Sequence, residues 1–376
     1  MLLSGINLTL MIGPAVPVPV PKAVLDALTD VEVTAKTDGP SVFQLKFKID
    51  KNSPLHTIFL LASGAQIPLM RVVIYVTMNG SPEVLIDGVM TDNQITPGGS
   101  GESPVLTITG EDLTRVMDYI DFTGIPYPAM PPEARVLLIL AKYAVFGVIP
   151  MVIPSIMLDV PIPIDRIPLQ QGTDLAYVSK LADDVGYVFF VMPGPAPGTT
   201  IAYWGPDIKV GVPQPALNID MDAHTNVESL NFSFNSDAGT LPIVFIQEQF
   251  SKAPIPIPIP DITPLSPPLG LIPPIPKQFP IIEGTSKLTP IQAVLIGLAK
   301  AAKKADAVTG SGSLDVLRYG RLLKSRGLVG VRGAGMAFDG LYYVKSVTHK
   351  IKRGEYKQGF ALARNGLVST VSRVPA

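Results

Sequence analysis

The chain has 376 residues, of which 47% are hydrophobic and only 16% charged, and its formal net charge is -1. Charged residues usually make up about a quarter of a soluble protein, so we expect partner proteins to cover much of this surface. The lack of cysteine excludes disulfides, thiolate metal sites and cysteine nucleophiles. The net charge argues against the basic excess that drives binding to nucleic acid phosphates.

The first third of the chain has the pattern of antiparallel strands. Apolar and polar residues alternate in each of these segments, which is typical of half-buried strands. Asn79-Gly80 predicts a tight hairpin turn, and an Asp-Gly-Pro turn at 38–40 joins the first pair. The predicted strands are residues 30–37, 41–50, 68–80, 81–95 and 104–112. Strands that follow one another in this way favour a barrel or sandwich.

The period then changes to that of an α/β segment. Helices are predicted at 110–120 and 131–147, and a third at the start of 170–192, with Thr173 as its N-cap and Gly186 as its stop. Strands are predicted at 187–192 and 199–205, which can pair with each other. The most membrane-like stretch, 136–158, is interrupted by Lys142 and two prolines, so we expect a buried helix followed by an extended segment. The N-terminus lacks the basic region of a signal peptide.

The last part returns to β patterns around a proline-rich ribbon. Strands are predicted at 226–237 and 241–251, and short strands across 314–340. Residues 253–284 carry proline at every second or third position, which predicts a polyproline II ribbon docked in a groove of its own or a neighbouring subunit. A helix with Thr289 as N-cap is predicted at 288–308. A hairpin at 340–366 with its turn at 353–355 closes the chain.

The sequence contains no recognisable catalytic or cofactor motif. The three histidines, His56, His224 and His349, are far apart and fall in no metal-ligand spacing, so we interpret each as structural or as a surface residue. The glycines of 330–335 have the wrong spacing for a nucleotide loop. Asp183 and Asp184 are neighbours on a helix and point about 100° apart, so they are interpreted as solvated. We therefore predict no catalytic, cofactor-binding or metal-binding residues.

Two further features have structural rather than chemical interpretations. The basic cluster at the last hairpin crosses the tip of a turn and contains Glu355, which favours a solvated tip or a protein-binding rim over nucleic acid. The cluster consists of Lys350, Lys352, Arg353 and Lys357. Its neighbours Tyr342, Tyr343 and Tyr356 are typical strand residues. Trp204, the only tryptophan, is predicted to pack in the α/β segment.

Four motifs, in order, resemble the phage late control protein D family of baseplate hub proteins, which includes the VgrG-like hubs. "QQGTDLAYVSKLADDVGYVFFV" (170–191) resembles its helix-strand signature, and "GLYYVKSVTHKIKRGEYKQGFALARNGL" (340–367) its closing hairpin. "ITGEDLTRVMD" (108–118) is similar to the entry into the inserted domain, and "VESLNFSFNSD" (227–237) to the return into the second barrel.

The resemblance implies a β-rich α+β fold with two small, tail-tube-like antiparallel β-barrels and an inserted α/β domain. The first barrel is expected at 1–112, completed by about 215–235, and the inserted domain at 113–214. The second barrel is expected at 236–376, including the ribbon 253–284 and the helix 288–308. The ribbon and the proline-rich stretch 12–22 are longer than the family needs, and we interpret both as additions that dock on neighbours.

The resemblance also implies a structural, non-enzymatic function. The family forms the hub at the centre of contractile injection machines, where a homotrimer joins the hexameric inner tube to a trimeric spike. Because the sequence stops at Ala376 without a spike domain, we expect a separate spike protein, together with the inner tube protein and other baseplate proteins as partners. No cofactor, specific nucleic acid ligand or membrane span is expected. We expect assembly in the bacterial cytoplasm and then incorporation into a phage-tail-like particle.

Two other functions remain as alternatives. A carbohydrate-binding or adhesin-type β protein would be monomeric and bind sugars. A tail-associated lytic enzyme would need a catalytic glutamate in a cleft or a metal trio, and the sequence contains no recognisable arrangement of either kind.

Overall fold

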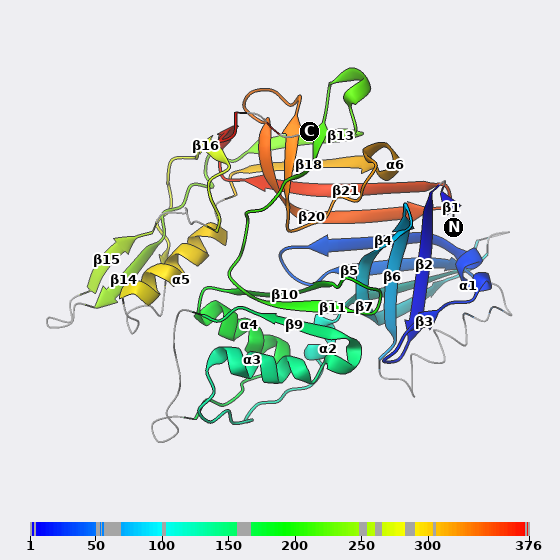
Figure 1. Cartoon of the computed structure of the whole chain (residues 1–376), viewed down its shortest axis with the longest axis horizontal. Coiled ribbons are helices and arrows are strands. Elements are labelled where there is room, and N and C mark those ends of the chain that lie inside the picture. Colours follow the sequence, from blue (N-terminus) through cyan, green and yellow to red (C-terminus); the bar gives the residue numbers. More distant parts are fainter. Residues whose placement is uncertain are drawn as a thin grey trace.

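The structure is a computed structural model in which most of the chain is described (Figure 1). The described residues are 2–3, 5–49, 53, 55, 69–99, 103–155, 167–247, 254–259, 265–282, 290–303, 306–372 and 374. The protein is rich in β structure, as the sequence predicts, and most of its strands are antiparallel.

One large sheet unites strands from both ends of the chain. Its strands are β1 (Leu2–Leu3), β2 (Ile6–Gly13), β3 (Val18–Pro19), β4 (Leu28–Lys36), β5 (Val42–Lys48), β6 (Arg71–Met78), β7 (Ser81–Thr96), β8 (Val105–Asp112), β12 (Gln214–Asn218), β13 (Ser229–Phe234), β18 (Val308–Asp315), β19 (Leu328–Arg332), β20 (Gly340–Lys352) and β21 (Glu355–Arg364). Along its main path the order is β1-β2-β6-β7-β8-β5-β4-β20-β21-β18-β13. β3 pairs with β2, and β19 pairs with β12 and β20. The antiparallel pairing of β4 with β20 joins the strands of the first third of the chain to those of its last part.

The predicted hairpins are confirmed, because local turn chemistry determines them. Asn79 and Gly80 both have positive φ, 51° and 83°, which is the conformation of the tight turn that matches the twist of two strands. β4 pairs with β5, β6 with β7, and β20 with β21, all antiparallel. Gly354 has φ 84° at the turn of the last hairpin. The buried side of these strands forms one apolar cluster that includes Val33, Leu45 and Val347.

The segment between the two groups of strands contains helices and a small mixed sheet. Its elements are α2 (Thr114–Met117), α3 (Pro132–Ala141), the 3₁₀ turn η2 (Ala144–Phe146), β9 (Val148–Val152), α4 (Asp174–Asp184), β10 (Val188–Pro193) and β11 (Thr200–Gly205). β11 pairs with β10 antiparallel, as predicted, and with β9 parallel. The predicted helix at 110–120 is wrong in extent, because β8 continues to Asp112 and leaves α2 a single turn.

The membrane-like stretch is confirmed as a helix followed by an extended segment, namely α3 and β9. Among the described residues, no helix has the length and apolar character needed to cross a membrane. The Thr173 hydroxyl accepts a hydrogen bond from the Ala176 amide at the start of α4, which confirms the predicted N-cap. α3, α4 and this small sheet enclose a second apolar cluster around the fully buried Trp204, as predicted.

The proline-rich ribbon contributes strands, so the prediction of polyproline II across 253–284 is wrong for part of it. The strands of the ribbon are β15 (Pro254–Pro258), β16 (Gly270–Ile272) and β17 (Ile281–Ile282). Their partners outside the ribbon are β14 (Ile243–Gln247) and β22 (Leu367–Ser369). β15 and β17 flank β14, and β16 pairs with β22. The ribbon is therefore docked on its own chain over much of its described length, while residues 260–264 and 283–284 lie outside the described part.

The spacing of the prolines explains how β15 joins a sheet. The Ile259 amide donates to the Pro242 carbonyl, on the side of β14. Amide groups point to alternate sides along a strand, so Ile255 and Ile257 also direct their N–H groups toward β14. The prolines between them, which have no N–H, occupy the positions where an N–H would point away from β14. The ladder loses no donor, and the outer edge of β15 offers none to a further strand.

The remaining helices complete the fold. α5 (Pro290–Lys303) lies within the predicted helix 288–308, but Val308 already belongs to β18. α5 packs on one face of the β15-β14-β17 sheet in a third apolar cluster. The segment 314–340, predicted as short strands, contains β19 but also the helix α6 (Val316–Tyr319), which Asp315 caps. α1 (Lys22–Ala27) and the 3₁₀ turn η3 (Asp222–His224) are the other short helices of the described part of the chain.

Candidate functional site

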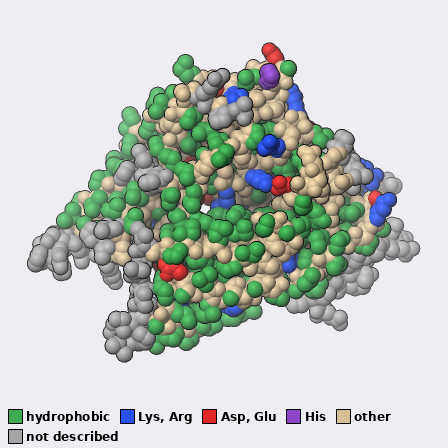
Figure 2. Space-filling model, in the orientation of Figure 1, with side chains coloured by type: hydrophobic (Ala, Val, Ile, Leu, Met, Phe, Trp, Pro, Cys, Tyr) green, Lys and Arg blue, Asp and Glu red, His purple; other side chains and the backbone are tan. Residues whose placement is uncertain are grey.

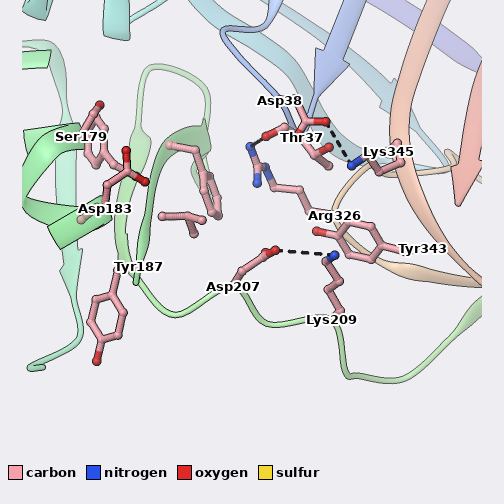
Figure 3. A pocket seen from close by; sticks show the side chains of 14 residues that line it. Thr37, Asp38, Ser179, Asp183, Tyr187, Asp207, Lys209, Arg326, Tyr343 and Lys345 are labelled. Atoms are coloured by element: carbon pink, nitrogen blue, oxygen red, sulfur yellow. Dashed lines mark hydrogen bonds and ion pairs between the residues drawn. The ribbon is translucent and has the colours of Figure 1, made fainter. Parts of the chain in front are cut away.

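A cavity of about 370 Å³ lies where the α4–β10 segment meets the large sheet, and it is the best candidate for a site (Figure 3). Ser179, Asp183 and Tyr187 line one side of it. Arg326 and Tyr343 come from the other side, beside the turn between β4 and β5. A second cavity of about 500 Å³ shares Arg326, Ser179 and Phe190 with the first. Figure 2 shows that the surface is hollowed near this junction.

Arg326 separates the two cavities and connects three parts of the chain. One guanidinium nitrogen, Nη2, donates to the Thr37 carbonyl at 2.8 Å. The guanidinium carbon lies 3.5 Å from the centre of the Phe190 ring of β10, a close cation–π contact. The backbone amide of Arg326 donates to the Val344 carbonyl of β20. Burial lowers the pKa of the guanidinium, although an arginine remains charged at any physiological pH.

The other charges beside the cavity are paired within the chain. Lys345 Nζ lies 3.0 Å from Asp38 and 3.1 Å from Asp306. Burial disfavours the charged ammonium, but the two carboxylates outweigh that effect and raise the pKa of Lys345. Asp207 lies 3.9 Å from Lys209, on the linker that follows β11. A ligand would therefore have to displace existing ion pairs, so this geometry favours a joint between segments over a binding site.

A second joint ties the large sheet to the β10–β11 turn through a buried ion pair. The Nε and Nη2 atoms of Arg71 donate to both carboxylate oxygens of Asp87, at 2.8 and 2.6 Å. The remaining guanidinium donors reach the carbonyls of Ala15 and Gly198, both at 2.9 Å. Thr200 Oγ1 lies 3.2 Å from Asp87. Because Arg71 and Asp87 neutralise each other in a buried place, removing either side chain would leave the charge of the other buried without a partner of opposite sign.

The "QQGTD" part of the helix-strand signature forms a buried polar network. Asp174, at the first position of α4, accepts hydrogen bonds from Tyr143 at 2.6 Å and from the Gln170 amide at 2.8 Å. Lys142 Nζ lies 2.6 Å from the same carboxylate. Gln170 accepts a hydrogen bond from Tyr127 at 2.6 Å. Burial and the hydrogen bond to Asp174 raise the pKa of Tyr143, so its hydroxyl remains a donor.

The strand-to-helix motif at 108–118 has a similar structural explanation. The Asp112 carboxylate accepts hydrogen bonds from the Ser41 amide at 2.6 Å and from the Thr114 hydroxyl at 2.5 Å. It joins the end of β8 to the turn before β5 and begins α2. Burial raises the pKa of Asp112, although the hydrogen bonds from Thr114 and Ser41 oppose the rise.

The two histidines within the described residues, His224 and His349, have no metal-binding arrangement. His349 is buried, and its Nδ1 lies 2.7 Å from the Tyr356 hydroxyl. Burial lowers the pKa of His349 to about 4. His224 is exposed in η3, and His56 lies outside the described residues. In the described part of the chain, no three His, Cys, Asp or Glu side chains are grouped so that they could hold a metal ion.

The remaining residues that the sequence singled out lie as predicted. Asp183 and Asp184 are exposed, and Asp184 pairs with Lys180 at 2.9 Å. The strand β19 ends in the glycine-rich stretch 330–335, with no helix after it. Two lysines of the basic cluster are partly neutralised: Lys352 lies 3.7 Å from Asp30, and Lys357 lies 2.9 Å from Glu228. Such pairing weakens the cluster as a nucleic-acid surface.

Several buried or half-buried charges escaped the sequence analysis because their partners are distant in the chain. These residues are Arg71, Asp87, Arg326 and Arg364. Arg364 donates to the carbonyls of Asp339 and Ala337 and lies 4.5 Å from the ring centre of Tyr342. An arginine within an apolar strand such as "FALAR" is the only signal the sequence offers for this contact.

Comparison with known proteins identifies the fold. No family model matches the chain, and no curated protein matches its sequence. Two solved structures match over nearly their full length. The tail protein from Neisseria meningitidis MC58 is 13% identical, with a TM-score of 0.62 over 97% of this chain and 98% of that one. The 43 kDa tail protein of prophage MuSo2 from Shewanella oneidensis is also 13% identical, with a TM-score of 0.62 over 96% and 98%.

A chain from a PdpA-VgrG complex is also similar. A chain of the lidded Francisella PdpA-VgrG complex is 7% identical, with a TM-score of 0.59 over 100% of this chain and 55% of that one. Identities this low establish the fold alone. The protein therefore has the fold of solved phage tail proteins, which confirms at the level of the fold the resemblance that the motifs indicated.

Proposed function

We propose that this protein is the structural hub of a contractile injection machine baseplate, in which three copies join the inner tube to the spike. The observation that carries the proposal is the likeness to two phage tail proteins over 97% and 96% of the chain. The likeness covers nearly all of both chains, so it is not confined to one segment. The four family motifs add independent support, since two of them form the Asp174 network and the Asp112 junction.

The proposed domain organisation is two small barrels with an insertion. We assign 1–112, with its return at about 215–235, to the first barrel and 236–376 to the second. The inserted α/β domain is assigned to 113–214. The separate apolar cluster around Trp204 supports the insertion, because its members lie between Val89 and Trp204 in the chain. The pairing of β4 with β20 would then be the contact that fixes one barrel against the other.

The function follows from symmetry and surface chemistry. Two tube-like barrels in each of three copies would present six similar surfaces to a sixfold tube, and three copies would match a threefold spike. The partners would be two further copies, a separate spike protein, the tube protein and other baseplate proteins. Permanent interfaces of this kind are large and apolar, which agrees with a chain that is only 16% charged. The proposed role is non-enzymatic, within a phage-tail-like particle.

The proposal can be tested by measuring mass in solution. The protein would be purified alone and after co-expression with the spike protein of the same machine, and both samples would be examined by native mass spectrometry. We expect trimers, and a complex of three copies of the chain with the spike. A monomer that never joins the spike, or one that binds sugars instead, would contradict the proposed function.

A further inference from the structure

The sheet β15-β14-β17 is apolar on both faces, although α5 covers only one of them. Val244 and Ile257 lie on the covered face, in the cluster with α5. On the other face, Ile281 pairs with Ile243 and is 61% exposed. Strands that are apolar on both faces are typical of sheets covered on both sides. The pattern therefore indicates that a second layer covers the open face.

The open face continues along the proline-rich ribbon. Ile275 and Phe279 are 80% and 56% exposed, and they lie on the ribbon that precedes Ile281. We call this surface the sheet patch, which consists of Pro256, Pro258, Ile275, Phe279 and Ile281. The one charged side chain on this ribbon segment within the described residues, Lys277, forms an ion pair with Asp237.

Helix α3 is also apolar on two sides, of which only the inner one is buried. Its inner stripe, with Val136, Ile139 and Leu140, is buried in the cluster around Trp204. Its outer stripe is also apolar, and runs on into η2 at spacings of one, three and four residues. We call this stripe the helix patch, which consists of Leu137, Leu138, Ala141, Ala144 and Val145. A helix that is apolar on all sides is normally buried, whereas a surface helix is polar on its outer side.

The helix patch is also without a free charge among its described residues. Leu137, Leu138 and Val145 are 45%, 51% and 62% exposed. Lys142, which lies beside them, directs its ammonium to the Asp174 carboxylate at 2.6 Å and lies 4.1 Å from the centre of the Phe122 ring. Figure 2 shows hydrophobic side chains gathered over the lower part of the molecule, where α3 lies in the same view of Figure 1.

We propose that the helix patch of one copy covers the sheet patch of the next copy in a closed ring. The two surfaces match in chemistry, because each is apolar and its nearby charge is neutralised within the chain. They also differ in shape, as a ring requires: rings are built from two different surfaces on every copy, whereas twofold dimers use one surface twice. Helix on sheet is a standard layer arrangement, and here it would complete the layers α5, sheet and neighbouring α3.

The outer edge of β15 is poorly suited to pairing with another strand, which favours contact of a neighbouring copy with the open face of the sheet. The outer edge of β15 offers no N–H donor, since its prolines lie on that side. A strand from another copy would find carbonyl acceptors but no N–H donors there, which disfavours pairing at this edge, while the open face stays accessible. This inference rests on the proposed function, because it assigns the contact between copies of the proposed trimer.

Complementation between variants tests the proposal. Ile281→Asp with Phe279→Asp disrupts the sheet patch, and Leu138→Asp with Val145→Asp disrupts the helix patch. We expect either variant alone to be monomeric in native mass spectrometry. An equimolar mixture of the two should form pairs, because each pair retains one intact sheet patch and one intact helix patch. Met336→Asp, at a residue that is 85% exposed in a turn outside both patches, is the matched control and should stay trimeric.

Cross-linking gives a second readout that does not depend on loss of assembly. The chain has no cysteine, so Phe279→Cys and Leu138→Cys introduce the only thiols. With a bifunctional maleimide, we expect the doubly substituted chain to give covalent trimers, and a mixture of the two single variants to give covalent dimers. Either single variant alone should remain uncross-linked.

The outcomes separate the inference from the proposed function. If the wild type is trimeric and both aspartate variants remain trimeric, the inference is wrong and the proposed function stands. Cross-links from a single cysteine to itself would indicate a twofold contact and also overturn the inference. Flotation of the protein with lipid vesicles, lost in the aspartate variants, would assign the patches to a bilayer instead. A wild type that never associates, alone or with the spike, contradicts the proposed function itself.

Discussion

Nδ1 of His349 lies 2.7 Å from the hydroxyl of Tyr356, and both side chains are buried at the β20–β21 hairpin. Gln358 lies beside them, and its amide both accepts from the Leu323 amide and donates to the Leu323 carbonyl, each at 2.9 Å. The His and Tyr of the closing hairpin motif are therefore partners in the core. This geometry confirms that His349 is a structural histidine.

His349→Ala should destabilise the protein, because the His349 side chain is buried. The substitution leaves the Tyr356 hydroxyl without its partner in the core, and it opens a cavity. We expect it to lower the free energy of unfolding by about 1–3 kcal/mol. Urea unfolding measures this loss. His224→Ala, at an exposed position, should stay within about 0.5 kcal/mol of the wild type, and an equal value for both variants would contradict the assignment.

The same burial makes stability depend on pH. Burial lowers the pKa of His349 to about 4, below the value of about 6.5 in an unfolded chain. As pH falls, the unfolded state binds the proton first, so stability is complete above about pH 6.5 and is lost progressively toward pH 4. The loss in the free energy of unfolding should reach about 3 kcal/mol near pH 4. We expect His349→Gln, which cannot titrate, to lack this part of the pH dependence. Parallel stability curves for the two proteins between pH 7 and 4 would show that the histidine takes up its proton equally in the folded and the unfolded state, and would contradict the lowered pKa.

The parts of the fold that local chemistry determines were predictable from the sequence. The Asn79-Gly80 turn needs two residues that tolerate positive φ, and the Thr173 cap needs a hydroxyl one residue before a helix. The motif at 170–191 was recognisable for the same reason. Its Gln170 and Asp174 are four residues apart and meet across one turn of chain.

The joints between segments were not predictable, because they depend on pairings across long separations. Arg326 meets Thr37 because β4 and β20, which are distant in the chain, are paired. The strand β15 was missed for a different reason. Proline usually argues against a strand, and only the register relative to β14 reveals that all the missing donors lie on the outer edge.

The Asp174 network should be sensitive to the loss of one charge. Asp174→Asn keeps the shape of the side chain but removes the carboxylate that accepts from Tyr143 and pairs with Lys142. We expect a loss of about 2 kcal/mol in the free energy of unfolding, since hydrogen bonds to buried charges contribute about 1.5–3 kcal/mol. Asp184→Asn, which breaks only an exposed pair with Lys180, is the control and should have little effect. Equal losses in both variants would mean that the network is not structural.

Charge introduced into the core of the closing hairpin should disrupt the fold. Tyr343 and Phe360 are each only 5% exposed, so Tyr343→Asp or Phe360→Asp would place a carboxylate among apolar side chains. We expect insoluble protein or a loss of more than about 3 kcal/mol in chemical unfolding. Tyr343→Phe retains the ring and should remain soluble and folded. A soluble, cooperative Tyr343→Asp protein of unchanged stability would show that this face of β20 is open to water.

Arg326 should hold the α4–β10 segment against the large sheet through its shape as well as its charge. Arg326→Lys retains the charge but loses the planar group that lies 3.5 Å from Phe190 and donates to Thr37. We expect faster hydrogen exchange in β10 and at residues 36–38, with a loss of about 1–2 kcal/mol in stability. Exchange in β6 and β7, which Arg326 does not contact, should be unchanged. Arg353→Lys, at the exposed tip of the β20–β21 hairpin, provides the matched control. If both variants exchange like the wild type, the Arg326 contact does not join these segments.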